Sequence, residues 1–249
     1  MQKMRYEISK LTIVRMAIYY NTLKKMLDEG ETTCPSTKIG QRTGISSSII
    51  RKDLSCFGEF GTKGVGYRID FLMQWIGQIL GYNTTWNTIV VGTGIPLLTM
   101  NYQNFLPPGF QVTAVLDINE QNFGVPLPQL GIAIESLRNL ESIVFTKKVS
   151  IGLVAVLPDQ AQIITDRLIA AGVVGIANFT QAQVIVPDNV ALTQINAGSM
   201  LSQLSYDLAN PLKLRVQQPK AKKNNRNNRP QKFKTGLSER RTSLKRLFL

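Results

Sequence analysis

The second half of this chain contains short apolar runs at intervals, and this series constrains its fold more than any other feature. Each run is long enough for one buried strand, and each interval is long enough for a crossover back to the same end of a sheet. The series predicts an α/β domain with a parallel sheet over about residues 86–210. The runs lie at residues 88–91, 111–116, 149–156, 173–177 and 190–195.

Helices are predicted between and after these strands. In DQAQIITDRLIAAG, residues 159–172, apolar side chains recur every third or fourth residue and share one helical face. This stripe consists of Ala161, Ile164, Leu168 and Ala171. A last helical stretch covers about residues 198–208.

A first helix is predicted near the N-terminus, ahead of the sheet. Residues 10–29 carry apolar side chains at spacings of three and four, and Gly30 follows as a helix terminator. The predicted buried stripe consists of Ile13, Met16, Ala17, Tyr20, Leu23 and Leu27.

Two further helices predict a helix-turn-helix. A short helix over 36–43, capped by Ser36, is followed after a glycine-containing turn by a third helix that opens at Ser46. The third helix, SSSIIRKDLSCF, turns Ile50, Leu54 and Phe57 toward a core. Basic and hydroxyl side chains on its other face suit contacts with phosphates and base edges in a major groove. The outer face consists of Ser47, Ser48, Ile49, Arg51, Lys52 and Ser55, and an ordinary solvated face is the alternative interpretation.

The segment GEFGTKGVGYRID, residues 58–70, is typical of the wing of a winged helix. Its four glycines alternate with aromatic and β-branched residues, which predicts a hairpin whose flexible tip carries Lys63. A helix over about 70–80, ended by Gly81, closes a domain that covers residues 1–81.

The positive charge of the chain is concentrated at its end. Of 29 Lys and Arg residues, 13 lie in 213–249 beside one acid, Glu239, so residues 1–212 carry 16 basic and 15 acidic side chains. Residues 211–249 cannot bury enough apolar area to fold alone and are predicted to form a disordered basic tail. Such a tail either solubilises the protein or attracts phosphates or anionic lipid without sequence preference.

Composition excludes several other classes of protein. The chain has no histidine, which removes Ser-His-Asp and Cys-His catalysis and the commonest metal ligand. Its two cysteines, Cys34 and Cys56, lack metal-ligand spacing and are expected to be reduced thiols. No apolar run is long enough for a membrane span, and the polar N-terminus carries no secretory signal, so a cytoplasmic protein is expected.

The stretch TIVVGTGIPLLTM, residues 88–100, resembles a nucleotide-binding turn in part. Gly92 and Gly94 stand where a dinucleotide-binding fold carries its first two glycines, for the tight turn and for the approach of the pyrophosphate. The third glycine position holds Leu97, whose side chain could push the helix off the strand. Pro96 removes an N–H that could donate to a phosphate.

The quoted motifs resemble one bacterial family closely. RKDLSCFGEFGTKGVGY, residues 51–67, and ITDRLIAAGVVGIANFT, residues 164–180, are similar to the redox-sensing transcriptional repressors of the Rex family. The resemblance covers about residues 8–208 and leaves the basic tail outside. It implies a homodimer with winged helices on operator DNA, Rossmann domains that sense NAD(H), and a final helix exchanged between subunits. A rising NADH/NAD ratio then favours a closed dimer that leaves the DNA, and no reaction is catalysed.

The resemblance also implies site residues. In the recognition helix and wing, the DNA contacts fall on Ser46, Ser47, Arg51, Lys52, Ser55, Lys63 and Gly64. Ile49 departs from the usually polar residue at its place, which implies either a different base preference or a contact with a thymine methyl group. Asp117, at the end of the second strand run, is placed to accept from a ribose hydroxyl and favours NAD over NADP. The cofactor contacts fall on Gly92, Thr93, Gly94, Ile95, Pro96, Leu97, Tyr102 and Asp117.

Three departures bear on the redox response. Besides Leu97, the arginine of the family's first helix is here Asn21, and the aspartate before its closing helix is here Asn196. In the family these two residues pair across the dimer in the DNA-binding form. Two amides leave no unpaired buried charge, but they remove a contact that distinguishes the two states.

These observations predict four parts: a winged-helix domain (1–81), a Rossmann-like sensing domain (86–196), a closing dimerisation helix (197–210) and the tail (211–249). The leading hypothesis is a cytoplasmic, dimeric DNA-binding repressor that is released by NADH. The alternatives are a paralogue that ignores NAD(H) and a nonspecific nucleic-acid-binding protein driven by its tail. A Rossmann oxidoreductase is less favoured, because no acid or base is visible near the turn and the wing would have no purpose.

Overall fold

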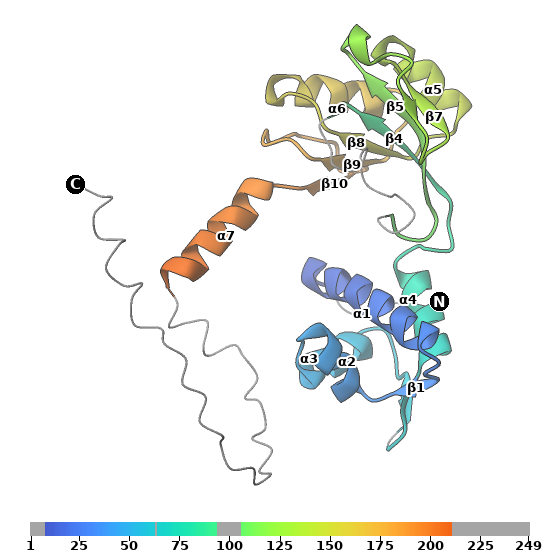
Figure 1. The fold of residues 1–249 in the computed structure, drawn as a ribbon, viewed down its shortest axis with the longest axis vertical. Helices are drawn as coiled ribbons and strands as arrows, with labels where there is room; N and C mark the ends of the chain where they lie inside the picture. Colours follow the sequence, from blue (N-terminus) through green and yellow to red (C-terminus); the bar gives the residue numbers. More distant parts are fainter. Residues whose placement is uncertain (1–7, 63, 94–105, 211–249) are drawn as a thin grey trace, which may run out of the picture. The chain divides into compact units, whose positions relative to one another are not determined.

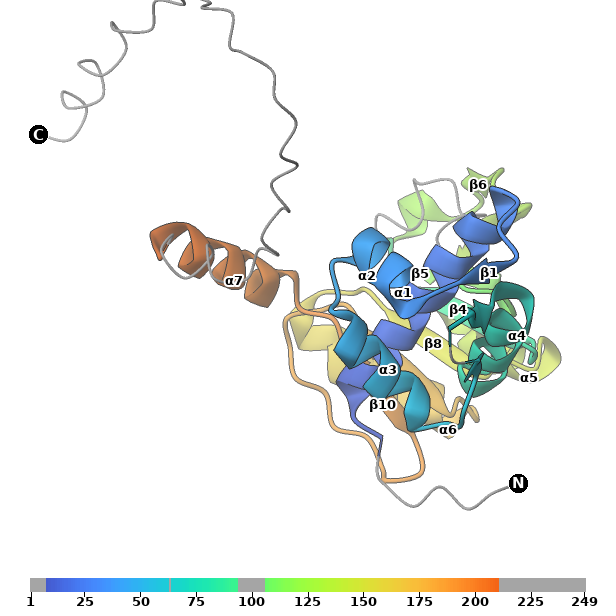
Figure 2. The same cartoon turned by 90° about the horizontal axis from the view of Figure 1, so that it is seen from below.

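The protein is represented by a computed structural model, which describes residues 8–62, 64–93 and 106–210 (Figure 1). Its N-terminal part is a winged helix, as the sequence predicts, with a three-stranded antiparallel sheet in the order β1-β3-β2. Helices α2 and α3 form a pair beside α1 in both views (Figure 1, Figure 2). The elements are α1 (Lys10–Asp28), β1 (Thr33–Cys34), α2 (Ser36–Thr43), α3 (Ser47–Ser55), β2 (Gly61–Thr62), β3 (Gly66–Arg68) and α4 (Ile69–Ile79).

The first helix is rotated relative to the predicted stripe. Met16 and Leu23 are buried as expected, but Ile13 and Leu27 are 37% and 39% exposed. The buried side of α1 consists of Thr12, Met16, Tyr19, Leu23 and Met26. Thr12 and Tyr19 face inward because they donate hydrogen bonds to a buried carboxylate of α3, described below. The stripe of apolar residues therefore predicted the helix correctly and its orientation only in part.

The second part is a seven-stranded sheet in the order β10-β9-β8-β4-β5-β7-β6. All neighbouring strands are parallel except β6 and β7, which pair antiparallel at the edge. The five predicted strands and the predicted parallel sheet are confirmed, and the antiparallel strand β6 is added at one edge. The strands are β4 (Trp86–Val91), β5 (Phe110–Asp117), β6 (Pro126–Leu127), β7 (Ile132–Ser136), β8 (Ile151–Val154), β9 (Gly175–Asn178) and β10 (Ala191–Gln194).

One face of this sheet is covered by α5 (Leu140–Thr146) and α6 (Ala161–Ala170) (Figure 1). Ile89 and Val91 of β4 point to this face, whereas Val90 between them belongs to a second apolar cluster on the other face. Burial on both faces explains why the strand sequences are continuous apolar runs. The predicted stripe of α6 is confirmed, with Ala161, Ile164 and Leu168 buried in the first cluster. The described connections also contain the 3-10 turns η3 (Glu120–Asn122), η4 (Leu137–Asn139) and η5 (Pro158–Gln160).

The last described helix, α7 (Ala197–Ala209), lies where the sequence predicts a helical stretch over about residues 198–208. By its contacts the chain divides inside this helix, into Met1–Ser199 and a second unit that begins at Met200. The apolar side chains of α7 are largely exposed: Met200, Leu201, Leu204, Tyr206 and Leu208. Among the helices of the described ranges, none is long and apolar enough to cross a membrane.

Candidate functional site

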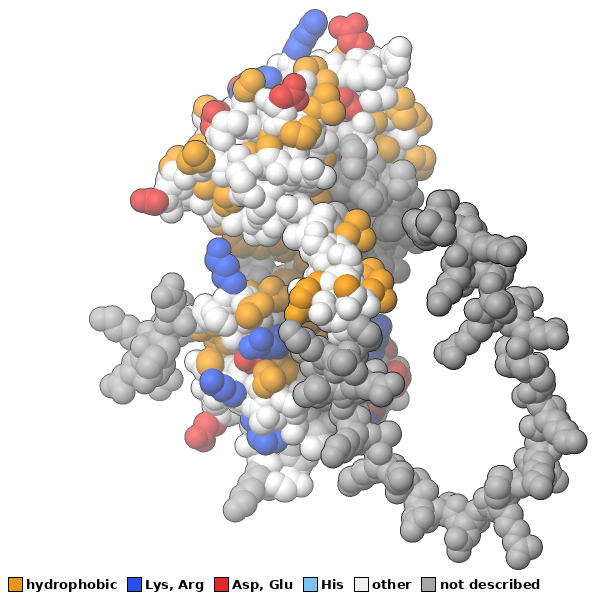
Figure 3. All heavy atoms as spheres, turned by 90° about the vertical axis from the view of Figure 1, so that its left-hand side faces the viewer, with side chains coloured by type: hydrophobic (Ala, Val, Ile, Leu, Met, Phe, Trp, Pro, Cys, Tyr) orange, Lys and Arg blue, Asp and Glu red, His pale blue; other side chains and the backbone are white. Residues whose placement is uncertain are grey.

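The exposed face of α3 is the first candidate site. Ser46 is the N-cap, and its Oγ accepts a hydrogen bond from the backbone N–H of Ile49 at 3.4 Å. Ile50 and Leu54 are buried, as predicted, while Arg51, Lys52 and Ser55 are exposed and Ser47 is half-buried. The Ser55 Oγ donates to the Lys52 carbonyl at 2.8 Å. Seen from the side of α2 and α3, Lys and Arg side chains of this domain are interspersed with apolar ones (Figure 3).

Arg51 lies in a cleft between the recognition helix and the wing. Its Nη1 donates to the Oγ of Ser36 at 3.1 Å, and Ser36 is buried at the first turn of α2. The prediction that Ser36 caps α2 is therefore wrong. The N-cap is Pro35, and Ser36 is the first residue of the helix, with a hydroxyl that accepts from Arg51. The cleft has a volume of about 420 Å³ and is lined by Pro35, Ser36, Arg51, Gly61, Thr62, Gly64, Val65, Gly66 and Tyr67.

The wing depends on glycine at its turns. Gly64 has φ +84°, and Gly66 has φ +100° with the position of a Cβ only 2.5 Å from the carbonyl oxygen of Cys34. Gly66 therefore lets β3 approach β1 closely enough to pair with it. Gly64 lies at the tip between β2 and β3, and its neighbour Lys63 lies outside the described residues.

Asp53 anchors the recognition helix to α1, a contact that the sequence analysis missed. Its carboxylate accepts hydrogen bonds from the Arg15 guanidinium at 2.6 and 2.7 Å and from the Tyr19 hydroxyl at 2.7 Å. Burial opposes ionisation of Asp53, but these hydrogen bonds outweigh it and lower the pKa of the carboxyl. The signal was an acid at the inward position between Ile50 and Leu54, which requires a donor inside the domain.

The turn after β4 is the second candidate site. Gly92 has φ +94°, and a Cβ there would lie 2.3 Å from the carbonyl oxygen of Ala155. Its N–H donates to the carbonyl of Leu116 at 2.7 Å, which continues the strand pairing into the turn. Gly92 is therefore required by the backbone itself. Thr93 follows it, exposed. The predicted cofactor residues Gly94, Ile95, Pro96, Leu97 and Tyr102 lie outside the described residues.

Asp117 stands at the C-terminal end of β5, as predicted, and is 6% exposed. Its Oδ1 accepts from the backbone N–H of Asn119 at 3.0 Å, and its Oδ2 accepts from the Asn122 amide at 2.8 Å. Burial opposes its ionisation, but these bonds and one from the Thr93 side chain lower the pKa of the carboxyl. Asp117 is therefore an ionised acceptor whose position is fixed by its neighbours.

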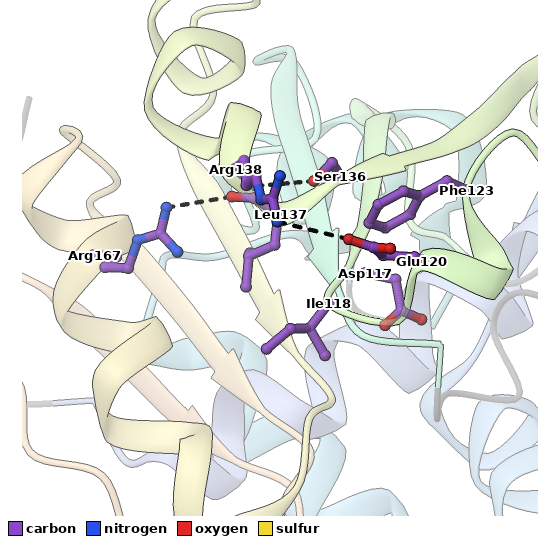
Figure 4. A pocket seen from close by; sticks show the side chains of 8 residues that line it. All are labelled: Asp117, Ile118, Glu120, Phe123, Ser136, Leu137, Arg138 and Arg167. Atoms are coloured by element: carbon purple, nitrogen blue, oxygen red, sulfur yellow. Dashed lines mark hydrogen bonds and ion pairs between the residues drawn. The ribbon is translucent and has the colours of Figure 1, made fainter.

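A pocket of about 260 Å³ opens beside Asp117 (Figure 4). Phe123 and Ile118 offer flat and apolar surface, and Ser136 and Asp117 offer hydroxyl and carboxylate oxygens. Arg167 is held by Glu141 at 2.9 Å and by the Leu137 carbonyl at 3.2 Å, whereas Arg138 reaches Glu120 only at 3.6 Å on the surface. The volume is below the roughly 300–1,000 Å³ of sites for whole drug-sized ligands, so the pocket suits one half of a dinucleotide. The lining consists of Asp117, Ile118, Glu120, Phe123, Ser136, Leu137, Arg138 and Arg167.

The two asparagines that depart from the family pattern lie in separate elements. Asn21 is exposed on α1. Asn196 precedes α7, and its Oδ1 accepts from the backbone N–H of Ser199 at 3.1 Å, as an N-cap does. Asparagine and aspartate cap helices equally well, so Asn196 keeps the cap and omits only the charge.

The two cysteines lie in different surroundings. Burial raises the pKa of the Cys34 thiol to about 11, whereas Cys56 is exposed. Within residues 8–62, 64–93 and 106–210, His, Cys, Asp and Glu form no group that could hold a metal ion.

Two family models match the segments of the chain that carry the two candidate sites. The family described as "Putative DNA-binding protein N-terminus" matches residues 7–55, and the family described as "CoA binding domain" matches residues 83–182. The redox-sensing transcriptional repressor Rex of Syntrophomonas wolfei is 38% identical over 205 residues, covering 82% of this chain and 97% of that protein. The chain belongs to the Rex family. The Rex of Syntrophobacter fumaroxidans is 34% identical, again with 82% and 97% coverage.

Solved Rex structures share the fold. A crystal structure of RSP in complex with β-NAD+ and operator DNA matches with a TM-score of 0.75 and 30% identity, covering 87% of this chain and all of that one. RSP in complex with β-NADH matches with a TM-score of 0.72 and 29% identity, covering 85% and 99%. The Rex architecture of an N-terminal DNA-binding domain and a mostly parallel, Rossmann-like sheet is therefore confirmed for this chain.

Proposed function

We propose that this protein is a transcriptional repressor that binds operator DNA as a homodimer and is released from it by NADH. One observation carries the proposal: a recognition helix with a wing and a nucleotide-type pocket beside a fixed carboxylate occur in one Rex-family chain. The DNA contacts are assigned to Ser46, Ser47, Arg51, Lys52, Ser55, Lys63 and Gly64. The nucleotide contacts are assigned to Thr93, Asp117 and the pocket residues Phe123 and Ser136, with residues 94–97 and Tyr102 of the turn.

The domains serve this function in sequence order. Residues 1–81 bind DNA, 86–196 bind NAD(H), and 197–210 form a dimerisation helix whose exposed apolar side chains pack against a second copy of the chain. The tail, residues 211–249, adds contacts to nucleic acid that do not depend on sequence. The protein acts in the cytoplasm, where its operator and NAD(H) are found.

We assign it no enzymatic activity. The described pocket offers acceptors and guanidinium groups, and its two acids, Asp117 and Glu120, both have partners. Both Arg167 and Asp117 are held by neighbours, which suits binding.

The test combines calorimetry and a mobility-shift assay on the purified full-length chain. We expect NADH to bind with higher affinity than NAD+ and to release a Rex operator in a concentration-dependent manner. Operator binding without any effect of millimolar NADH on DNA affinity or thermal stability would leave a repressor that ignores the cofactor. Absence of operator preference, with binding lost on deletion of 213–249, would leave only a tail-driven nucleic-acid binder.

A further inference from the structure

Ile49 is an exposed apolar side chain in the first turn of the recognition helix. It is 43% exposed and is not part of the apolar core of the domain, which uses Ile50 and Leu54 of the same helix. Ser48 and Lys52 of the same helix are exposed as well. An isoleucine at this place therefore contributes no core packing that would account for it.

The position of Ile49 in α3 is fixed. Its backbone N–H donates to the Oγ of the N-cap residue Ser46, and the next residue, Ile50, is fully buried. Farther along the helix, Asp53 is held by Arg15 and Tyr19 of α1. The first turn is thus tied at its cap and by its neighbour, so the Ile49 side chain presents a defined apolar surface.

The first turn of a recognition helix is the part that meets base edges in the major groove. There the bases present donors and acceptors, except that thymine alone also presents a methyl group. An isoleucine against donors or acceptors would remove them from water without a hydrogen bond, which is unfavourable. Against the thymine methyl, the same side chain buries apolar surface on both partners.

We propose that Ile49 is a specificity-determining residue that selects thymine in each operator half-site by contact with its C5-methyl group. This inference rests on the proposed DNA-binding function and adds to it a stated base and a stated chemical group. Arg51 and Lys52, which follow Ile49 in the same helix, are among the assigned DNA contacts, and Ile49 adds base discrimination to their affinity.

Deoxyuridine provides the test, because it pairs as thymine does and lacks only the methyl group. The operator is first selected from a random DNA library with the full-length chain, and each thymine is then replaced singly by deoxyuridine. Removal of one buried methyl group corresponds to a loss of about fourfold in affinity. We expect this loss at one thymine per half-site for the wild-type chain.

The matched variants are Ile49→Ala and, as control, Ser48→Ala, the adjacent exposed residue of the same turn. In Ile49→Ala the deoxyuridine substitution should cost less than about 1.5-fold, so that the two changes couple in a double-mutant cycle. In Ser48→Ala the loss of about fourfold should persist. Both variants alter exposed side chains, and their thermal unfolding should match the wild type.

Each outcome decides a different statement. If the chain selects an operator but no deoxyuridine substitution weakens binding, the role of Ile49 is overturned and the repressor function stands. If methyl sensitivity persists in Ile49→Ala, another residue reads the methyl group and the inference also falls. If no operator is selected at all, the proposed function fails and takes this inference with it.

Discussion

Asp53 shows how a single buried charge can organise a DNA-binding domain. Its carboxylate belongs to α3, and the side chains that donate to it, Thr12, Arg15 and Tyr19, belong to α1. The Arg15 side chain is 27% exposed, so its charge keeps partial contact with water while Asp53 does not. Hydrogen bonds to charged groups contribute about 1.5–3 kcal/mol each at most, and here they offset the burial of the carboxylate.

Replacing Asp53 should destabilise the domain in a pH-dependent way. We expect Asp53→Ala to lower the free energy of unfolding by about 2 kcal/mol or more at pH 7, because Arg15 and Tyr19 lose their acceptor. The folded-state pKa of Asp53 is lowered, so its stabilisation is complete above the unfolded value near 4 and is lost as pH falls through the folded value. Urea unfolding from pH 7 to pH 3 measures this.

The control for that experiment is Asp28→Asn, an exposed acid at the end of α1. It should change the unfolding free energy by less than about 0.5 kcal/mol. A constant difference between wild type and Asp53→Ala down to pH 3 would contradict the assigned role of the carboxylate.

Asp117 should govern the affinity for NADH. Asp117→Asn keeps the volume of the side chain but replaces an ionised acceptor by an amide, and we expect about tenfold weaker NADH binding by calorimetry. Glu120→Gln is the matched control, since Glu120 lines the same pocket on its exposed rim. Equal losses in the two variants would show that general negative charge, not the fixed Asp117 acceptor, determines affinity.

Among the elements, local patterns located most of those that matter for DNA binding. The bounds of α2 and the opening of α3 follow from turn and cap residues, which act within a few positions of the chain. Strand β7 was missed, because its sequence IAIES is short and mixes apolar with polar residues. Helix α5 was also missed, and it has only seven residues. Arg138 joins Asp117 only because β7 pairs with β5, and no sequence spacing reports that strand order.

Helix α7 depends on its cap. We expect Asn196→Ala to cost about 1 kcal/mol of helix stability, and to weaken dimerisation by about fivefold if α7 packs on a second copy. Asn196→Asp is the control, because it preserves the cap. Sedimentation equilibrium measures the dimer, and an unchanged dissociation constant in Asn196→Ala would place dimer contacts elsewhere.

Considered as a whole molecule, the protein combines a nearly neutral body with a strongly basic end. Deleting residues 213–249 removes 13 basic side chains and one acid. We expect the deletion to retain operator preference but to flatten the dependence of affinity on salt, since each phosphate contact contributes a slope of about −0.9 on duplex DNA. Mobility-shift assays at salt concentrations from about 50 to about 200 mM measure the slope.

A chain with the same tail residues in scrambled order is the control. It should behave as the wild type, because attraction to phosphates depends on charge and not on order. Loss of operator preference on deletion, or failure of the scrambled tail to restore the slope, would contradict this division of roles.

Gly92 has a consequence for tracing how this family diverges. Any side chain at this position would meet the backbone of Ala155, whether or not a nucleotide is ever bound. Selection for folding alone therefore keeps the glycine, even in a lineage whose ligand has been lost. A glycine at this position in another family member therefore indicates an intact sheet and not a bound cofactor. Changes at Asp117 and in the pocket beside it are the better indicator of whether a family member still binds the cofactor.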